Sequence, residues 1–160
     1  MRERSNTCCF TGHRDISGMT FQELTANMEK VVPRLLERGY RYFVCGGAIG
    51  FDTYAAMYVC ALKKRGFDVK LVLMLPCRDQ TAKWGEYDKQ VYNVILSYAD
   101  EVIWLADRYY NGCMQKRNRA MVDASSACIC YMHPHKSGGT WQTVEYATAN
   151  GLPVVNVFRE

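Results

Sequence analysis

The sequence predicts an α/β protein with a mostly parallel, doubly wound sheet of about six strands and helices on both faces. Short apolar runs alternate with stretches of helical periodicity, an order typical of parallel sheets with right-handed crossovers. In addition, three glycine-marked corners each follow an apolar run and open a predicted helix. Such corners lie at the carboxyl edge of a parallel sheet, where backbone N–H groups and helix dipoles favour anions. The fold class is therefore Rossmann-like.

The first half of the chain predicts three strand and helix units. Residues 7–11 form an apolar run that ends at a glycine corner, and helical periodicity follows over 21–38, where Pro33 can kink the helix and Gly39 is suited to end it. The second unit is a strand at 42–45 with a helix at 52–65. The third is a Val/Leu/Met run at 69–75, typical of a strand buried on both faces, with a helix from about 84 to 98.

The second half predicts three further strands and two helices. Strands are expected at 101–105, 127–132 and 154–158, and helices at 114–124 and 140–150. No linker, internal repeat or low-complexity segment interrupts this order. Since 49% of the residues are hydrophobic, which suffices to cover both faces of one sheet, residues 1–160 are expected to form a single domain.

Charge and apolar patterning exclude several classes of protein. The formal net charge is +4, and Lys and Arg are scattered, so a nucleic-acid partner is not expected. No apolar run approaches the roughly 20 residues that span a bilayer, so no membrane span is expected. The polar segment 1–6 does not resemble a signal peptide, which favours a cytoplasmic location. A homodimer is compatible with a chain of this size.

The eight cysteines are interpreted as reduced thiols, because a disulfide scaffold is typical of small secreted proteins. Several lie within apolar runs, where cysteine packs as a small core residue. Cys128 and Cys130 with His133 and His135 contain a zinc-type ligand set, but their spacing differs from that of known zinc sites. No metal site is therefore predicted.

The second corner is the segment GGAIGFD, which begins at Gly46 and Gly47 and ends with Gly50, Phe51 and Asp52. Glycines after a strand permit close backbone approach to a phosphate or a ribose. A tight turn without any ligand is the alternative, because the segment is not a full GxGxxG. Asp52 is a candidate for a sugar hydroxyl, and capping of the helix is its alternative role.

The third corner is Ser137-Gly138-Gly139-Thr140. Here a hydroxyl beside two glycines can supplement backbone N–H groups around an anion. Glu145 lies five residues beyond Thr140, where it is a candidate base or ribose ligand. A solvated helical glutamate is the alternative.

Cationic candidates occur at two further corners. Arg117-Asn118-Arg119 opens a predicted helix, and the planar guanidinium suits bidentate phosphate binding. His13 and Arg14 follow the first glycine, Gly12. The alternative for the Arg117 segment is a solvated face, and the alternative for His13 is a capping role or a position facing water.

A polar loop that contains Gln80 leads to Trp84, and Tyr87, Tyr109 and Tyr110 also lie in or beside loops. These aromatic rings are candidates for stacking on a base, with core or rim packing as the alternative.

The order of these motifs resembles a known superfamily. TGHR, GGAIGFD, the Gln80 loop with Trp84, RNR and SGGT before a final unit follow one another as in the SLOG superfamily, and most closely its YpsA-like branch. The resemblance covers nearly the whole chain. For the YpsA-like branch it implies a nucleotide-derived ligand, such as NAD or ADP-ribose, with no established reaction.

Two relatives within the superfamily imply other activities. In LOG-type phosphoribohydrolases, an arginine helix and a PGGxGTxxE corner cleave nucleoside monophosphates. Residues 114–121 resemble that helix and match its arginine at Arg117, and the carboxylate falls on Glu145. The chain departs from the corner at Ser137, Trp141 and Gln142. The other relative, DprA, binds single-stranded DNA, and the RNR and GGAIGFD segments also resemble its corresponding stretches.

These observations lead to one principal hypothesis with two alternatives. The principal hypothesis is a sensor or regulatory protein that binds a nucleoside phosphate, NAD or an ADP-ribose-like ligand and requires no cofactor. The first alternative is an N-glycosidase in which Glu145 and Arg117 are catalytic, and the second is DNA binding of DprA type. The ligand-binding candidates are Gly12, His13, Arg14, Gly46, Gly47, Gly50, Asp52, Gln80, Trp84, Asn118, Gly138, Gly139 and Thr140.

Overall fold

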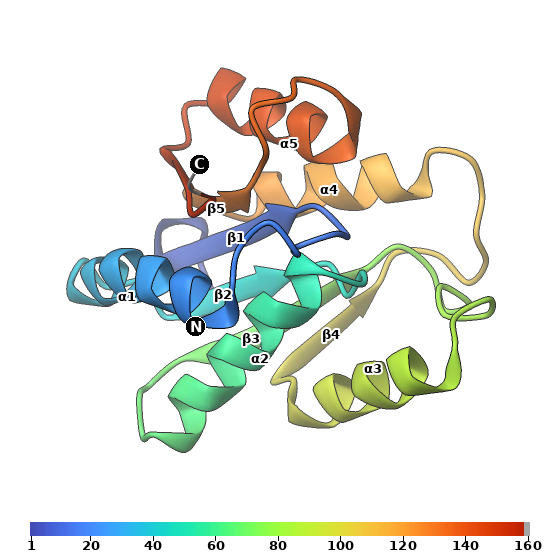
Figure 1. Ribbon diagram of the computed structural model, residues 1–160, viewed down its shortest axis with the longest axis horizontal. Coiled ribbons are helices and arrows are strands. Elements are labelled where there is room, and N and C mark those ends of the chain that lie inside the picture. The colour runs from blue at the N-terminus through green and yellow to red at the C-terminus, as the bar shows by residue number, and fades with distance from the viewer. Residues whose placement is uncertain (159–160) are drawn as a thin grey trace.

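The computed structural model describes residues 1–158, which form one six-stranded sheet between two layers of helices (Figure 1). The strands are parallel and follow the order β4-β3-β2-β1-β5-β6. Their bounds are β1 Thr7–Gly12, β2 Tyr42–Cys45, β3 Lys70–Leu75, β4 Glu101–Trp104, β5 Ala127–Tyr131 and β6 Val154–Asn156. The helices are α1 Phe21–Glu37, α2 Phe51–Lys64, α3 Glu86–Tyr98, α4 Cys113–Asp123 and α5 Gly138–Ala149, after a 3-10 turn at Arg4–Asn6.

The direction of winding reverses between β1 and β5. The chain first moves outward from β1 through β2 and β3 to β4, and then returns to place β5 on the other side of β1. Figure 1 shows α4 and α5 together on one side of the sheet, and α1, α2 and α3 on the other. In open α/β sheets such a reversal opens a crevice at the carboxyl ends of the strands.

Two separate cores show why the strands are apolar throughout. Neighbouring residues of β1 point to opposite faces: Cys8 and Phe10 pack in the core under α1, α2 and α3, and Cys9 packs in the core under α4 and α5. Ile129 and Cys128 of β5 divide in the same way. All eight cysteines are free thiols and seven are buried, which agrees with the packing role expected for them.

Every predicted element forms, and no bound differs from its expected position by more than two residues. The helix expected from Trp84 begins at Glu86, because residues 81–84 form a turn in which the N–H of Trp84 donates to the carbonyl of Thr81. The strand expected to reach residue 158 ends at Asn156. Pro33 lies inside α1 without ending it, and Gly39 follows the helix with a φ of 94°. Over residues 1–158, the helices are too short or too polar to cross a lipid bilayer.

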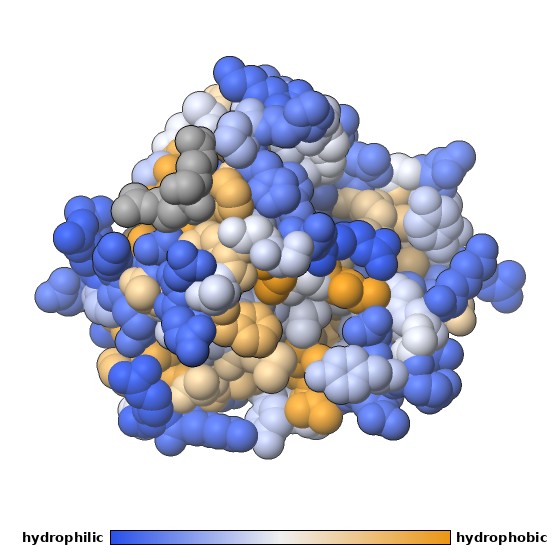
Figure 2. All heavy atoms as spheres, viewed as in Figure 1, coloured by the Kyte–Doolittle hydropathy of each residue, from blue (hydrophilic) through white to orange (hydrophobic). Residues whose placement is uncertain are grey.

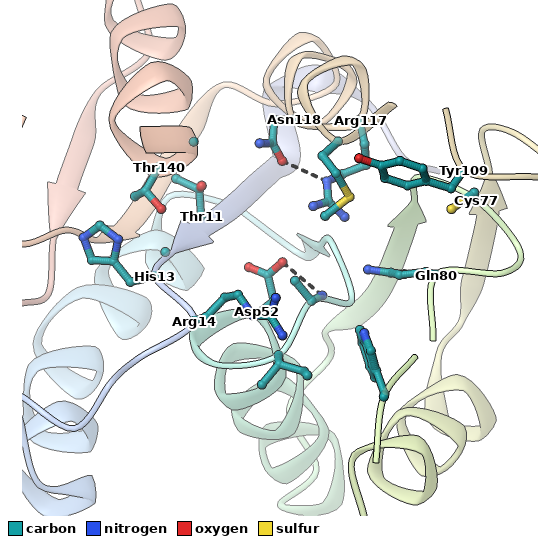
Figure 3. A pocket seen from close by; sticks show the side chains of 16 residues that line it. Thr11, His13, Arg14, Asp52, Cys77, Gln80, Tyr109, Arg117, Asn118 and Thr140 are labelled. Atoms are coloured by element: carbon teal, nitrogen blue, oxygen red, sulfur yellow. Dashed lines mark hydrogen bonds between the residues drawn. The ribbon is translucent and has the colours of Figure 1, made fainter. Parts of the chain in front are cut away.

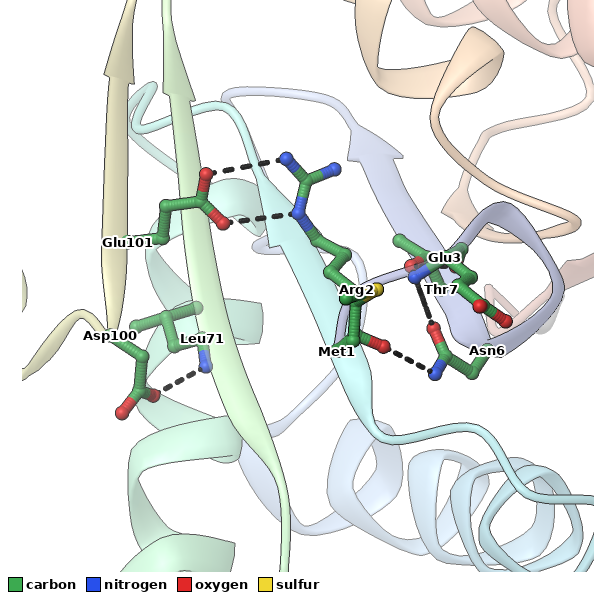
Figure 4. A network of polar contacts seen from close by, with 8 residues as sticks. All are labelled: Met1, Arg2, Glu3, Asn6, Thr7, Leu71, Asp100 and Glu101. Carbon is green, nitrogen blue, oxygen red and sulfur yellow. Dashed lines mark hydrogen bonds and ion pairs between the residues drawn. The ribbon is translucent and has the colours of Figure 1, made fainter.

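The amino edge of the sheet is closed by polar contacts (Figure 4). Arg2 donates two hydrogen bonds to the carboxylate of Glu101, at 3.0 and 3.3 Å, and the carboxylate of Asp100 accepts from the N–H of Leu71 at 2.8 Å. Lys63 adds an ion pair to Asp100 at 2.7 Å. These contacts join the starts of β3 and β4 to neighbouring segments.

Candidate ligand-binding site

The carboxyl edge holds a cavity of about 430 Å³, here called the edge cavity (Figure 3). Its walls come from the end of β1, the loops after β2, β3 and β4, the first turns of α2 and α5, and the first two turns of α4. The structure brings ten of the predicted residues to its walls: Gly12, His13, Arg14, Asp52, Gln80, Trp84, Arg117, Asn118, Gly139 and Thr140. Gly46, Gly47, Gly50, Gly138 and Glu145 are not among its lining residues.

Arg117 is a buried residue of α4, with 3% of its surface exposed. Its Nη1 donates to the carbonyl of Gly46, and its Nε donates to the side-chain oxygen of Asn118 at 2.8 Å. Burial lowers the pKa of the guanidinium, and the nearby Asp52 carboxylate opposes that shift. Two of its nitrogens are therefore bonded to the protein, while the side chain still lines the cavity.

Asp52 lies near Arg117 and is also buried. Burial raises the pKa of its carboxyl group, while the charge of Arg117 and a hydrogen bond from the N–H of Ala48 at 3.3 Å lower it. This bond ties Asp52 to the loop before α2 and is not a helix cap, because α2 begins after Gly50 and has no side-chain cap at that residue. Figure 3 shows the carboxylate directed toward the space between α2 and α4.

Protein atoms occupy the space beside the glycines of the first two corners. A Cβ at Gly12 would lie 2.5 Å from Phe51, one at Gly47 would lie 2.4 Å from Leu75, and one at Gly50 would lie 2.3 Å from the backbone of Arg14. In addition, the N–H of Phe51 at the start of α2 donates to the carbonyl of His13 at 3.0 Å. At these corners the glycines permit close packing of chain against chain.

The third corner is different, because it is open. Among residues 1–158, no atom outside the chain neighbours and the backbone of α5 lies within 4 Å of a Cβ built at Gly138 or Gly139, and Ser137 makes no side-chain cap to α5. The first N–H groups of an α-helix have no partner within the helix. Since Gly139 and Thr140 line the edge cavity, the amino end of α5 faces it with unoccupied donors.

Gln80 contributes a further donor. Its Nε2 is buried and has no hydrogen-bond partner among the described residues, while its Oε1 lies 3.5 Å from the hydroxyl of Tyr92. Figure 3 shows the amide nitrogen turned toward the cavity. An unpaired buried amide costs free energy, and a ligand acceptor in the cavity would remove that cost.

His13 and His133 form a contact at the rim. The backbone N–H of His133 donates to Nε2 of His13 at 3.0 Å, and the two rings lie 4.4 Å apart. Burial, followed by the nearness of His133, lowers the pKa of His13. Neutral His13 thus joins the loop after β5 to the end of β1.

Glu145 lies elsewhere, in a second cavity of about 310 Å³ between α4 and α5. This α4–α5 cavity shares Asn118 and Gly139 with the edge cavity, and Arg119 and Tyr146 also line it. Glu145 lies two turns into α5 and lines this cavity together with residues of α4, a packing that sequence spacing alone does not reveal. The structure therefore does not bring Glu145 together with Arg14, Asp52 or Gln80.

Five lining residues were not named as candidates from the sequence: Thr11, Ala48, Ile49, Cys77 and Met114. Thr11, Ala48 and Ile49 lie within the TGHR and GGAIGFD segments, and Met114 begins the segment that resembles the arginine helix. Burial raises the pKa of the Cys77 thiol to about 12, so the thiol is neutral and packs the wall. Cys77 belongs to no recognisable motif, and only its position shortly after the end of β3 could have identified it. Among residues 1–158, no group of three His, Cys, Asp or Glu side chains is placed to hold a metal ion.

Two solved structures share this fold. DNA processing protein A (DprA) from Streptococcus pneumoniae superposes with a TM-score of 0.60 and 21% identity, over 92% of this chain and 48% of that chain. DprA from Helicobacter pylori, described for its single-stranded DNA binding mode, superposes with a TM-score of 0.63 and 19% identity, over 94% and 64%. This chain thus spans between about half and two thirds of their length. The expectation that nucleic acid is not a partner receives no support from this likeness.

The sequence comparisons point to one family. The Uncharacterized SPbeta prophage-derived protein YoqJ of Bacillus subtilis is 30% identical over 141 residues, which cover 80% of this chain and 82% of YoqJ. The YpsA family model, described as the YspA SLOG family, matches residues 8–151. Since that match takes in most of the sheet and all five helices, the chain belongs to the YspA SLOG family.

Proposed function

We propose that this protein binds a nucleotide-derived ligand in the edge cavity and acts as a sensor or regulatory protein. The observation that carries the proposal is the convergence of unoccupied donors on one cavity: the first turn of α5 and the buried amide of Gln80. A volume of about 430 Å³ falls in the range of about 300 to 1,000 Å³ that small-molecule sites occupy.

The chemistry of the walls suggests an orientation for the ligand. The phosphate would meet the N–H groups of Gly139 and Thr140, where the helix dipole favours negative charge, with Arg14 as the exposed cation of the opposite wall. Buried Arg117 would add positive potential from behind the cavity. Ribose hydroxyls would donate to Asp52, and Gln80 with Trp84 would frame the base.

Native mass spectrometry of protein purified from cells tests the proposal directly. A retained small molecule with the mass of a nucleotide is the expected result. Titration calorimetry with AMP, ADP-ribose and NAD⁺ then measures affinity for known compounds. Absence of binding by all three, together with no retained nucleotide, would refute the proposal.

A matched pair of variants tests the placement of the ligand. Gln80→Leu removes the unpaired amide, and the dissociation constant of the bound nucleotide is expected to rise about threefold to tenfold, since one hydrogen bond contributes about 0.5 to 1.5 kcal/mol. Gln22→Leu, at an exposed position on α1, is the control and should bind as the unmodified protein does. Equal affinities in both variants would place the ligand elsewhere.

The N-glycosidase alternative, as the resemblance to phosphoribohydrolases implies it, requires Glu145 beside the sugar. Glu145 lines the α4–α5 cavity instead, which counts against Glu145 as the catalytic carboxylate of a ligand in the edge cavity. Incubation with a panel of nucleoside monophosphates separates the two: release of free base that is lost in Glu145→Gln would establish the enzyme.

The DNA-binding alternative draws on the fold shared with DprA. It predicts retardation of single-stranded oligonucleotides at low salt and a steep loss of affinity as salt rises. A gel shift at two salt concentrations distinguishes it from the nucleotide proposal, which predicts no such retardation.

A further inference from the structure

A third cavity, of about 620 Å³, lies on the face covered by α1, α2 and α3. We call it the aromatic groove, because five aromatic side chains line it: Phe21, Tyr54, Tyr58, Trp84 and Tyr87. Phe21 is 69% exposed and Tyr87 is 76% exposed. Figure 2 shows apolar residues gathered over the middle of this face, where α2 runs between α1 and α3.

The aromatic groove adjoins the edge cavity. Ile49 and Trp84 line both, so the two spaces meet at these side chains. The Trp84 ring packs edge-on against Tyr92 with centroids 5.4 Å apart, and this packing holds it at the junction. Because Trp84 is also proposed to frame the base, a further group of the ligand would enter the groove along Ile49, the other residue that lines both spaces.

The charges of the two spaces differ. The groove includes two carboxylates, Glu29 and Asp88, and its cation, Arg65, already pairs with Glu29 at 3.8 Å. A phosphate is therefore disfavoured in the groove and favoured beside α5. The groove suits a flat ring that is neutral or cationic, because tyrosine and tryptophan faces attract cations and stack on planar groups.

The shape of the groove is set by aromatic stacking. Phe21 packs on Tyr54 with centroids 5.9 Å apart and ring planes 22° apart, and the Tyr54 hydroxyl bonds that of Thr25 at 2.6 Å. The aligned rings thus present a fixed flat surface beside the Trp84 junction. A preformed surface of this kind binds a planar group with little loss of side-chain freedom.

We propose that the aromatic groove is a second subsite for the ligand of the edge cavity and that it takes a flat aromatic ring joined to the phosphate-bearing part. The ligand class is then a nucleotide whose phosphate carries a further ring-bearing group, rather than a simple nucleoside monophosphate. The inference rests on the proposed function, because the edge cavity must hold the nucleotide part.

Titration calorimetry with three probes tests the inference. AMP reports on the edge cavity alone, while ADP-ribose and NAD⁺ differ by one aromatic ring. NAD⁺ is expected to bind about tenfold more tightly than ADP-ribose, since stacking of one ring contributes about 1 to 3 kcal/mol. The double variant Phe21→Ser/Tyr87→Ser should lose this preference and keep the AMP affinity unchanged.

Exposed aromatic residues outside the groove supply the matched control. Phe67→Ser/Tyr98→Ser changes two side chains that are each 43% exposed and should keep the NAD⁺ preference.

Equal affinity for ADP-ribose and NAD⁺ in the unmodified protein would overturn the subsite, as would a preference that survives in the groove variant. A groove variant that changes the sedimentation coefficient of the protein but not the preference would identify the groove as an interface between copies. Failure of all three probes, together with no retained nucleotide in native mass spectrometry, would refute the nucleotide proposal itself, and the subsite with it.

Discussion

The buried guanidinium of Arg117 donates a hydrogen bond to the main-chain carbonyl of Gly46, 71 residues earlier in the chain. The contact joins the second turn of α4 to the loop after β2, across the carboxyl edge of the sheet. Arg117 therefore stabilises the packing of α4 against this loop and also supplies positive potential behind the edge cavity.

Replacement of Arg117 by Met is expected to lower the free energy of unfolding by about 3 kcal/mol or more, because it leaves the Asp52 carboxylate buried without its neighbouring positive charge. Urea denaturation measures the change. Lys116→Met, one residue away and exposed, should change stability by less than about 0.5 kcal/mol. The double variant Arg117→Met/Asp52→Asn should recover part of the loss, and a double variant less stable than the single one would contradict this account.

Gly46 leaves room for Arg117 and Asp52. A Cβ at this position would lie 2.5 Å from Nη1 of Arg117 and 2.8 Å from a carboxylate oxygen of Asp52. Gly46→Ala is expected to cost about 1 to 3 kcal/mol of stability, as overpacking of a core does. Gly139→Ala is the control, because no described atom outside its own helix and chain neighbours lies within 4 Å of its Cβ position and its φ is not positive. Thermal unfolding measures the midpoint temperature of each variant. Equal midpoints in the two variants would show that the Arg117 guanidinium makes room for the added methyl group without loss of stability.

The sequence sufficed for the fold because local and long-range signals agree in this chain. The apolar run from Leu71 to Leu75 divides between the two cores, as expected of a strand buried on both faces. Helix α1 carries an N-terminal capping box between Thr20 and Glu23 and a glycine after its end. A chain in which strands and helices alternate in this way can form only a few sheet topologies. The carboxyl-edge cavity followed from that topology alone.

The interior of the site could not be predicted in the same way. The letters GGAIG do not show whether the space beside the glycines holds a phosphate or another segment of the protein. In this structure Leu75 fills the space beside Gly47, and Arg14 fills the space beside Gly50. At the first corner, Phe51 fills the space beside Gly12 in the same way. These neighbours are distant in sequence and carry no local signal. The side of α5 on which Glu145 lies likewise depends on how α5 packs against α4.

His13 predicts a dependence of stability on pH. Its folded-state pKa is lowered from 6.5, so the folded state binds this proton less readily than the unfolded chain does. The stabilising contribution is present above pH 6.5 and is lost as the pH falls through the folded-state pKa, because protonation of Nε2 removes the acceptor for the N–H of His133. His13→Gln should reduce the fall in unfolding midpoint between pH 7.5 and 5, whereas His135→Gln, at an exposed position, should not. If the unfolding midpoint falls by the same amount in the unmodified protein and in both variants, the pH dependence arises from groups other than His13.

The two adjacent glycines of the third corner predict opposite results. Gly138 has a φ of 89°, so Gly138→Ala should cost about 1 kcal/mol or more of stability. Gly139 has a negative φ within α5 and no atom within 4 Å of its Cβ position, so Gly139→Ala should leave stability unchanged or raise it by about 0.4 to 1 kcal/mol. Because Gly139 lines the edge cavity, the added methyl group should nonetheless weaken AMP binding in calorimetry by keeping the phosphate away from the N–H groups of α5. A Gly139→Ala protein that is fully stable and binds AMP with unchanged affinity would remove the amino end of α5 from the phosphate site.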